Sequence, residues 1–372
     1  MKQQWKTPAA TLLANGLLAA TVPAFAGGTL KIDDTKWVSV GAGLRTSFNA
    51  VEDAAPNGDD YSKDFDLNSI RLYVNGQIHK YIKFTFNTER DTSGGDDDIR
   101  ALDVIAQFEF TPEFNVWGGR FLPPSDRSNL DGPYYLMTWN FPVVQTYPAI
   151  FAGRDDGVAV WGDTSLAGSQ FKYQVGAFDG CADGSPCDTG ANTSDNLLYA
   201  ARFTFNFWDP EPGYYNSSTY YGSKDILAIG VAAQSQADAV GTVADPSDFF
   251  GWNVDFLMEK KLGNEGVVTL EGAYYDFDLD GATVTGGLIE GNSSYIQGAY
   301  LFPKTVGIGK FQPYLQLSSL EPDNGGDTDN WEAGLNYVID GHNARLSAVI
   351  GNNDPAGGSD SNYFTLGVQL QI

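Results

Sequence analysis

Few side chains in this sequence could carry out acid–base or nucleophilic chemistry. His79 and His342 are the only two histidines, and each lies in a short connection where a role in the turn is the simpler interpretation. The sequence has no HExxH motif, no GxSxG motif, no pair of CxxC motifs and no glycine-rich phosphate-binding loop. We therefore expect a protein that is not an enzyme and that holds no metal and no cofactor.

The two cysteines, Cys181 and Cys187, lie close together in "CADGSPC". In an oxidising compartment such a pair is expected to form a short-loop disulfide, since no histidine or third cysteine lies nearby to complete a metal site. Free thiols or a metal pair are the alternatives. A disulfide at this position would stiffen a loop rather than perform a reaction.

The first 26 residues have the features of a secretory signal peptide. Lys2 and Lys6 precede an apolar run that ends in Ala24-Phe25-Ala26, a small-x-small cleavage pattern. We expect a mature chain of residues 27–372, in which loss of the two lysines changes the formal net charge from −25 to −27. No later segment has the long apolar run of a membrane-spanning helix. The strongly acidic composition argues against nucleic acid as a binding partner.

Charged and polar side chains alternate with apolar ones along most of the mature chain. In Asn68–Glu89, for example, Ile70, Leu72 and Val74 share one face while Arg71 lies on the other. This period of two predicts β-strands, and about sixteen such segments recur between Trp37 and Ile372. The sequence is therefore expected to be all-β.

The connections between these segments alternate in length. Short ones interleave with longer acidic ones such as "EDAAPNGDD" and "DTSGGDDD", although "DPEPGYYNSSTYYG" and "PKTVGIGK" are long for the short side. Together with the even strand number, this predicts a transmembrane antiparallel β-barrel with short periplasmic turns and long acidic extracellular loops. A bilayer forces strands to close, so the apolar face would meet lipid and Arg71 and Lys83 would point into a lumen. The alternative is a soluble β-sandwich whose apolar face is the core.

Several stretches resemble the phosphate-selective porin O/P family of Gram-negative outer membranes. They are "SIRLYVNGQIHKYIKFTFN", "VWGGRFLPPSDRSNL", "GRDDGVAVWG", "FKYQVGAFDG", "LYAARFTFNF", "FQPYLQL" and "LNYVIDGHNARL", in the family's order and spanning most of the mature chain. The resemblance implies a sixteen-stranded barrel, a homotrimer, an inward-folded third loop and a basic lumen that passes anions. The expected partners are small solutes or ions, outer-membrane lipid and lipopolysaccharide, and two further copies of the chain.

The longest external connection, Leu122–Gly153, is rich in proline, tyrosine and tryptophan. Such a loop fits a solvated rim poorly, and the resemblance suggests that it folds into the barrel and narrows it. The alternative is a loop that packs against a neighbouring subunit at the trimer axis. The candidate gate charges of this constriction loop are Asp126, Arg127, Asp131 and Arg154.

The charges expected to face the lumen sort by position along the chain. The basic ones are Arg45, Arg71, Lys83, Lys172, Arg202 and Arg345, and the acidic ones are Asp255, Glu259, Glu271 and Glu332. If the barrel closes in chain order, a basic arc faces an acidic arc across the lumen and gives anions one wall to follow. The alternative is that these charges pair with one another.

These features predict an outer-membrane porin, a passive diffusion channel for small hydrophilic solutes, with anions such as phosphate as the expected cargo. The acidic loops argue against strong phosphate selectivity, because an acidic mouth attracts cations and repels phosphate. A general or cation-preferring porin, a non-conducting structural barrel and an outer-membrane hydrolase are the alternatives. The acidic loops could also bind divalent cations or keep the surface hydrated.

Overall fold

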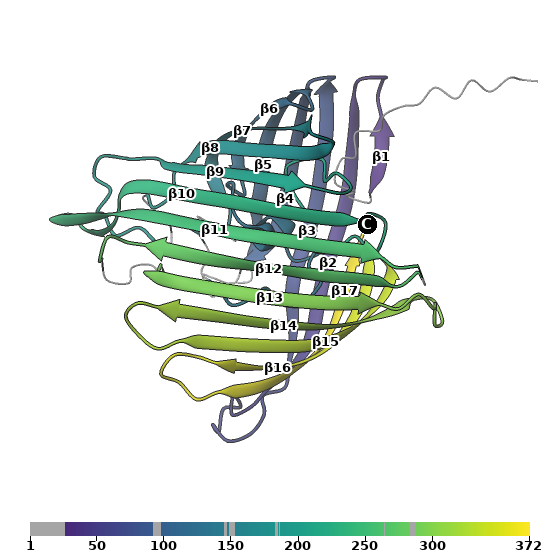
Figure 1. Ribbon diagram of the computed structural model, residues 1–372, viewed down its shortest axis with the longest axis vertical. Helices are drawn as coiled ribbons and strands as arrows, with labels where there is room; N and C mark the ends of the chain where they lie inside the picture. Colours follow the sequence, from purple (N-terminus) through teal and green to yellow (C-terminus); the bar gives the residue numbers. More distant parts are fainter. Residues whose placement is uncertain are drawn as a thin grey trace, which may run out of the picture.

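The computed structural model describes residues 27–91, 98–144, 147–148, 153–182, 185, 187–263, 265–282 and 288–372. The expected signal peptide lies outside these residues. The described chain forms sixteen long strands, β2 to β17, each antiparallel to the next (Figure 1). Their bounds are β2 Trp37–Val51, β3 Asp64–His79, β4 Ile82–Asp91, β5 Asp98–Thr111, β6 Phe114–Phe121, β7 Asp155–Leu166, β8 Ser169–Phe178, β9 Leu198–Asn206, β10 Ile226–Thr242, β11 Asp245–Lys261, β12 Val267–Asp278, β13 Gly291–Leu301, β14 Lys310–Pro322, β15 Thr328–Asp340, β16 Ala344–Asp354 and β17 Ser361–Gln371.

The sheet closes between its first and last long strands. β17 pairs with β2, with Leu370 opposite Leu44, and Ala42 and Ile372 exchange backbone hydrogen bonds of 2.9 and 2.8 Å. A short additional strand, β1 (Gly28–Lys31), pairs with the start of β2, where β17 no longer reaches. The predicted all-β, sixteen-stranded antiparallel barrel is confirmed.

The described residues form a single short helix, α1 (Arg127–Asp131), which lies in the connection between β6 and β7. Among the described residues, no helix has the length and apolar composition needed to cross a membrane.

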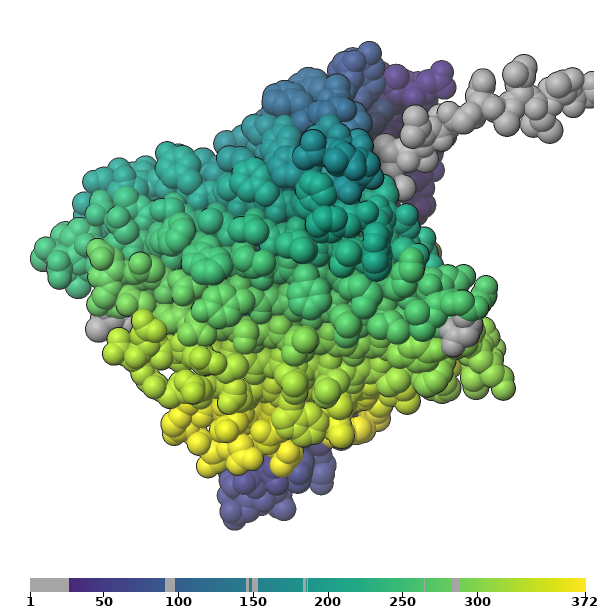
Figure 2. Space-filling model, in the orientation of Figure 1, coloured from purple at the N-terminus to yellow at the C-terminus, as the bar shows by residue number. Residues whose placement is uncertain are grey.

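Polar side chains line the inside of the barrel and apolar side chains cover its outside. Leu72, Ile296 and Leu366 are 44%, 52% and 48% exposed, whereas the inward-facing Arg71 and Gln297 are 7% and 2% exposed. Figure 2 shows one face of this outer wall, where strands from β8 to β16 lie side by side. An apolar outer surface of this extent is matched to hydrocarbon rather than water. The soluble β-sandwich alternative is therefore wrong.

One external connection is shorter than the sequence pattern suggests. The alternating pattern predicts strands at Leu227–Ala233 and Trp252–Met258, which are the first part of β10 and the middle of β11. Each of these strands is 17 residues long, and only two residues join them. A register shift between Gln236 and Val240 interrupts this hairpin. Beyond Ala233 the residues of β10 are polar or small as far as Ala239, so the alternation is too weak to predict the strand.

The connection between β9 and β10, residues 207–225, does not form a rim turn. It enters the barrel from the same end as the turn between β15 and β16, and it packs against the inner wall (Figure 1). By contrast, Ala167 and Gly168 join β7 and β8 with φ values of 53° and 85°, the left-handed pair that a two-residue hairpin requires.

Candidate functional site

The described residues of the connection between β6 and β7 lie inside the barrel, where the sequence predicts a constriction loop. Tyr134, Leu136, Met137 and Trp139 are at most 3% exposed. These residues cross the lumen and pack on the wall formed by β14 to β17 and β2. Gly43 and Gly367 make room for them, because a Cβ at either position would lie 2.8 Å from Tyr134 or 2.6 Å from Trp139.

Charged side chains of the wall hold this loop by its backbone. Arg45 donates to the carbonyl of Trp139 at 2.6 Å, and Arg345 donates to the carbonyl of Leu136 at 2.7 Å. Glu332 accepts from the Trp139 N–H at 3.2 Å and from the Asn140 side chain at 2.6 Å. Three of the predicted pore-lining charges therefore fix the loop in place.

The start of the loop is fixed by Asp126, which caps α1. Its Oδ2 accepts from Asn129 N at 3.1 Å, from Ser128 Oγ at 2.6 Å and from the Tyr275 hydroxyl at 2.8 Å. Burial raises the pKa of Asp126 above its usual range, although these hydrogen bonds oppose the shift. Asp126 therefore joins the loop to β12.

Residues 207–225 form a second inserted segment, which enters from the periplasmic end predicted for the short turns. Tyr214 is 1% exposed and stacks on Trp117, with ring centroids 4.7 Å apart. Glu259 accepts from Thr219 Oγ1, Tyr220 N and Gly222 N at 2.7 to 2.9 Å. The predicted acidic residue Glu259 therefore holds this segment against β11.

The two inserted segments meet at a buried ion pair. Arg127 of α1 donates to both carboxylate oxygens of Glu211 at 2.9 and 2.6 Å, and the two side chains are at most 1% exposed. Burial alone would raise the pKa of Glu211, but the Arg127 guanidinium outweighs burial and lowers it to about 2. Glu211 is therefore ionised and locks the second segment to the first.

His342, in the turn between β15 and β16, also joins the two segments. Its Nδ1 lies 3.1 Å from the carbonyl of Tyr134 and its Nε2 lies 2.9 Å from the carbonyl of Thr219. Burial lowers the pKa of His342 to about 4, against the opposing effect of the two carbonyls. The neutral ring can donate to only one of these carbonyls at a time.

The predicted basic residues of the wall have partners in the structure. Arg71 pairs with Glu89 at 2.8 Å, Lys83 with Glu109 at 2.6 Å and Arg202 with Asp255 at 2.5 Å. The Lys172 ammonium lies 3.3 Å from Asn216 Oδ1 of the second segment. These contacts favour the alternative in which lumen charges pair with one another over two opposed arcs.

The remaining predicted charges differ in how well they are partnered. Arg154 donates to Asp103 at 3.0 Å, and Glu271 Oε1 accepts from the Tyr295 hydroxyl at 2.7 Å. Asp131 is 4% exposed, and neither of its carboxylate oxygens accepts a hydrogen bond from the described residues. Of the four predicted constriction-loop charges, all of which the structure describes, Asp131 is the one whose side chain forms no hydrogen bond with a described residue.

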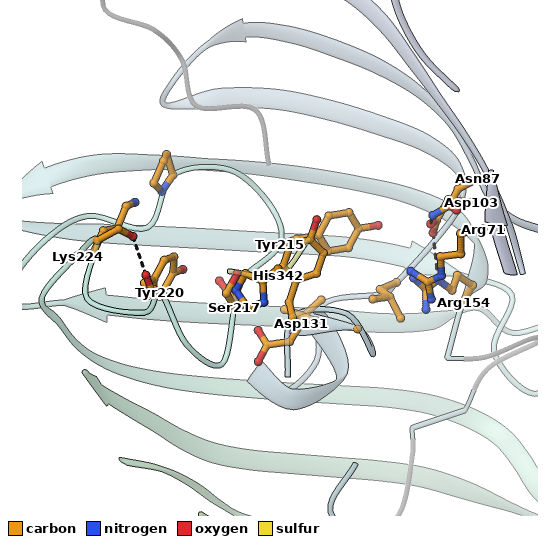
Figure 3. Close-up of a pocket in the computed structure, with 17 residues that line it drawn as sticks. Arg71, Asn87, Asp103, Asp131, Arg154, Tyr215, Ser217, Tyr220, Lys224 and His342 are labelled. Atoms are coloured by element: carbon orange, nitrogen blue, oxygen red, sulfur yellow. Dashed lines mark hydrogen bonds and ion pairs between the residues drawn. The ribbon is translucent and has the colours of Figure 1, made fainter. Parts of the chain in front are cut away.

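Two cavities lie beside the inserted segments. The first has a volume of about 330 Å³ and lies between them, with Arg71 and Arg154 at one end, Lys224 at the other and Asp131 between (Figure 3). The second has a volume of about 500 Å³ and extends along Lys83 and Glu109 to the turn between β5 and β6. Both cavities contact Asp103, Pro212 and Tyr215, so they adjoin each other on the β3 to β6 side of the lumen.

Sequence reasoning missed four carboxylates of this site: Glu89, Asp103, Glu109 and Glu211. The first three lie at inward positions of strands, so their alternation with apolar neighbours was an available signal. Glu211 is not among the predicted site residues because the sequence pattern assigns its segment to a connection on the short-turn side of the barrel. The length and five tyrosine and tryptophan residues of Phe207–Asp225 are the signal that this connection is buried.

Cys181 and Cys187 form a disulfide in the described part of the connection between β8 and β9. The Cys181 N–H donates to Gln236 Oε1 at 2.8 Å, which ties this loop to β10.

The closed barrel, polar lumen and inserted loop define the fold of the outer-membrane porins. No family model matches the sequence, and no curated protein matches it. Among solved structures, the anion-selective porin from Comamonas acidovorans is similar, with a TM-score of 0.58 and 14% identity over 91% of this chain and 100% of that one.

Two further structures share this fold. Outer-membrane expressed OmpT of Vibrio cholerae has a TM-score of 0.56 and 14% identity, covering 93% of this chain and 100% of that one. The outer membrane channel DcaP of Acinetobacter baumannii has a TM-score of 0.55 and 11% identity, covering 92% and 99%. At these identities the comparisons establish the fold.

Proposed function

We propose that this protein is an outer-membrane porin through which small hydrophilic solutes diffuse passively. The observation that carries the proposal is a closed barrel with an apolar exterior, whose charged interior keeps two adjoining cavities beside its inserted segments. The similar folds of the Comamonas porin and the Acinetobacter channel support it. The N-terminal signal peptide and surrounding lipid and lipopolysaccharide belong to the same proposal.

For ion preference, the contacts support a general porin more than the anion or phosphate preference expected from the O/P family resemblance. Beside the two adjoining cavities, Arg71, Lys83 and Arg154 each have a carboxylate within 3.0 Å. A passing anion must therefore compete with a fixed carboxylate for each of these cations. We expect weak discrimination by charge.

The decisive measurement is made on the purified protein in a planar bilayer. Step conductance in KCl is expected, and in a KCl gradient the reversal potential should lie close to zero. A reversal potential close to that of chloride would support the predicted preference for anions such as phosphate. A reversal potential close to that of potassium would favour the cation-preferring alternative. The absence of any conductance would favour the structural barrel.

A homotrimer is the proposed assembly, as the family resemblance implies. OmpT of Vibrio cholerae, in a structure of its trimer form, is 15% identical with a TM-score of 0.54 and covers 91% of this chain. Sedimentation of the detergent-solubilised protein, corrected for bound detergent, tests the trimer directly.

The hydrolase alternative has little support in the described residues. Both ring nitrogens of His342 face backbone carbonyls, so neither faces a serine, threonine or cysteine nucleophile. His79 Nδ1 accepts from the Tyr81 N–H at 3.4 Å, a contact within its own turn.

A further inference from the structure

Asp131 is a buried carboxylate that lines a cavity and accepts no hydrogen bond from any residue that the structure describes. It ends α1, is 4% exposed and lines the cavity of about 330 Å³ between the inserted segments (Figure 3). Its neighbour Arg127 uses both terminal guanidinium nitrogens on Glu211, so Arg127 interacts with Asp131 electrostatically, but within the described chain no ion pair joins them. A buried carboxylate without a partner is costly, so such a group points to a partner that comes from outside.

Carboxylates outnumber cations among the charges that act on Asp131, with Glu271, Glu211 and Asp126 against Arg127. Glu271 of β12 interacts electrostatically with Asp131, and Glu271 Oε2 is also buried without a donor. The arginines at the far end of the cavity, Arg71 and Arg154, have their own carboxylates in Glu89 and Asp103. Lys224 lies at the other end, against the Tyr220 ring.

The kind of cation follows from the donor atoms present. Among the described residues, no three histidine, cysteine, aspartate or glutamate side chains gather in a way that could hold a metal ion. An alkylammonium instead carries three N–H donors and can use separate acceptors and tyrosine faces. The protein already places one such group here, since the Lys224 ammonium lies 2.7 Å from the Pro210 carbonyl and 5.4 Å from the centre of the Tyr220 ring.

We propose that the cavity between the two inserted segments is a binding site for solutes that carry a primary ammonium group, and that Asp131 is the residue that recognises this group. This inference rests on the proposed function, because the solute reaches the cavity through the lumen. It adds a preferred class of cargo, small organic amines, to a channel that otherwise discriminates weakly by charge.

The test uses the full-length protein in a planar bilayer with three probes of similar size. Butylammonium has the charge and the N–H donors, tetramethylammonium has the charge without the donors, and butanol has neither. Butylammonium should reduce the KCl current at the lowest concentration. Asp131→Asn should raise its half-blocking concentration about tenfold or more, the loss expected for a charge-assisted hydrogen bond.

Asp163→Asn is the matched control, since Asp163 lines the other cavity and the substitution removes the same charge. Its half-blocking concentration should stay within about twofold of the unsubstituted protein. Equal block of the Asp131→Asn variant and the unsubstituted protein would overturn the proposal, and so would equal block by tetramethylammonium. If the protein shows no KCl current, the porin proposal fails separately, and calorimetric titration of butylammonium into the protein in detergent decides whether the site exists.

A pH series provides a second measurement. Burial raises the pKa of Asp131 well above its ordinary value, Glu271 adds to the shift, Arg127 opposes it, and Glu211 and Asp126 reinforce it. Asp131 therefore holds a proton at low pH, and an ammonium must displace this proton. Block by butylammonium should strengthen as pH rises, and a block independent of pH in the unsubstituted protein would contradict recognition by Asp131.

Discussion

Arginine side chains in this lumen act mainly as supports for other parts of the chain. Arg45 and Arg345 donate to loop carbonyls, and Arg127 holds a carboxylate of the second inserted segment. A guanidinium suits this role because its planar donors reach several acceptors at once and remain charged when buried. The number of lumen arginines therefore does not measure attraction for anions, because the terminal guanidinium nitrogens of these three arginines already donate within the protein.

At the same scale, His342 gives the protein a pH-dependent stability. Its pKa falls from an ordinary 6.5 to about 4 in the fold, mainly through burial. The unfolded chain binds the proton first, so stability is complete above about pH 6.5 and is lost as pH falls towards 4. The loss is about 3 kcal/mol at most, at 1.4 kcal/mol per pKa unit.

The check is the unfolding temperature in detergent of the unsubstituted protein and of His342→Gln, measured from pH 7 to pH 4. The variant keeps a donor for one carbonyl and cannot titrate, so its unfolding temperature should fall less over this interval. Tyr135 and Tyr221 pack against the His342 ring, and the Arg345 guanidinium adds to the lowering of the His342 pKa. Parallel curves for the two proteins would show that His342 does not cause the loss.

At the scale of elements, the two inserted segments depend on each other. Glu211→Gln should leave Arg127 buried with an incomplete counter-charge and lower the free energy of unfolding by about 3 kcal/mol. Replacing both residues with methionine should recover much of this loss, because a buried ion pair is often no more stable than an apolar pair. Denaturant titration in detergent measures both effects.

The control is the exposed pair Arg120–Asp156, whose side chains are 31% and 42% exposed. Asp156→Asn should cost less than about 1 kcal/mol. In single-channel recordings, Glu211→Gln should also give larger current fluctuations, because the segments can then move apart. A quiet current together with unchanged stability would mean that the pair does not hold the segments.

The sequence predicts the strands of the barrel wall far better than the contacts made by the segments inserted in the lumen. Each of the sixteen predicted segments matches one of β2 to β17, and three of them run one residue past the end of their strand, because alternation such as Leu44, Arg45, Thr46 reflects a lipid face and a wet face. Contacts across the lumen leave no periodic signal. Arg127 and Glu211 lie 84 residues apart, and their pairing depends on where two loops meet in space.

Glycines on the inner face of the barrel are an exception, because their positions indicate where an inserted segment approaches the wall. At Gly43 and Gly367, an inward position has lost its side chain where Tyr134 and Trp139 need the space. A glycine in a strand often marks a close approach by another part of the chain. Inward-facing glycines on the neighbouring strands β2 and β17 therefore indicate the part of the wall against which the β6–β7 loop packs.

At the scale of the whole molecule, the outer surface can be tested directly. Leu72→Arg places a charge on the outward face of β3, where Leu72 is 44% exposed, and should destabilise the protein in lipid by about 2 to 4 kcal/mol. Val243→Arg is the control, because Val243 lies in the tip of the β10–β11 hairpin and is 66% exposed. Folding into liposomes against urea measures both, and equal stability of the two variants would contradict burial of Leu72 in hydrocarbon.

The seam between β2 and β17 also has a consequence for biogenesis. Since β17 pairs with β2, and Ala42 and Ile372 bond to each other, the cylinder is sealed only when these two distant strands have met. The described residues of the β6–β7 connection and residues 207–225 lie inside this ring. The chain is therefore expected to reach the membrane before the barrel has closed. The long-range pairing of β2 with β17 is slow, so it is expected to form there, with chaperones protecting the open chain until then.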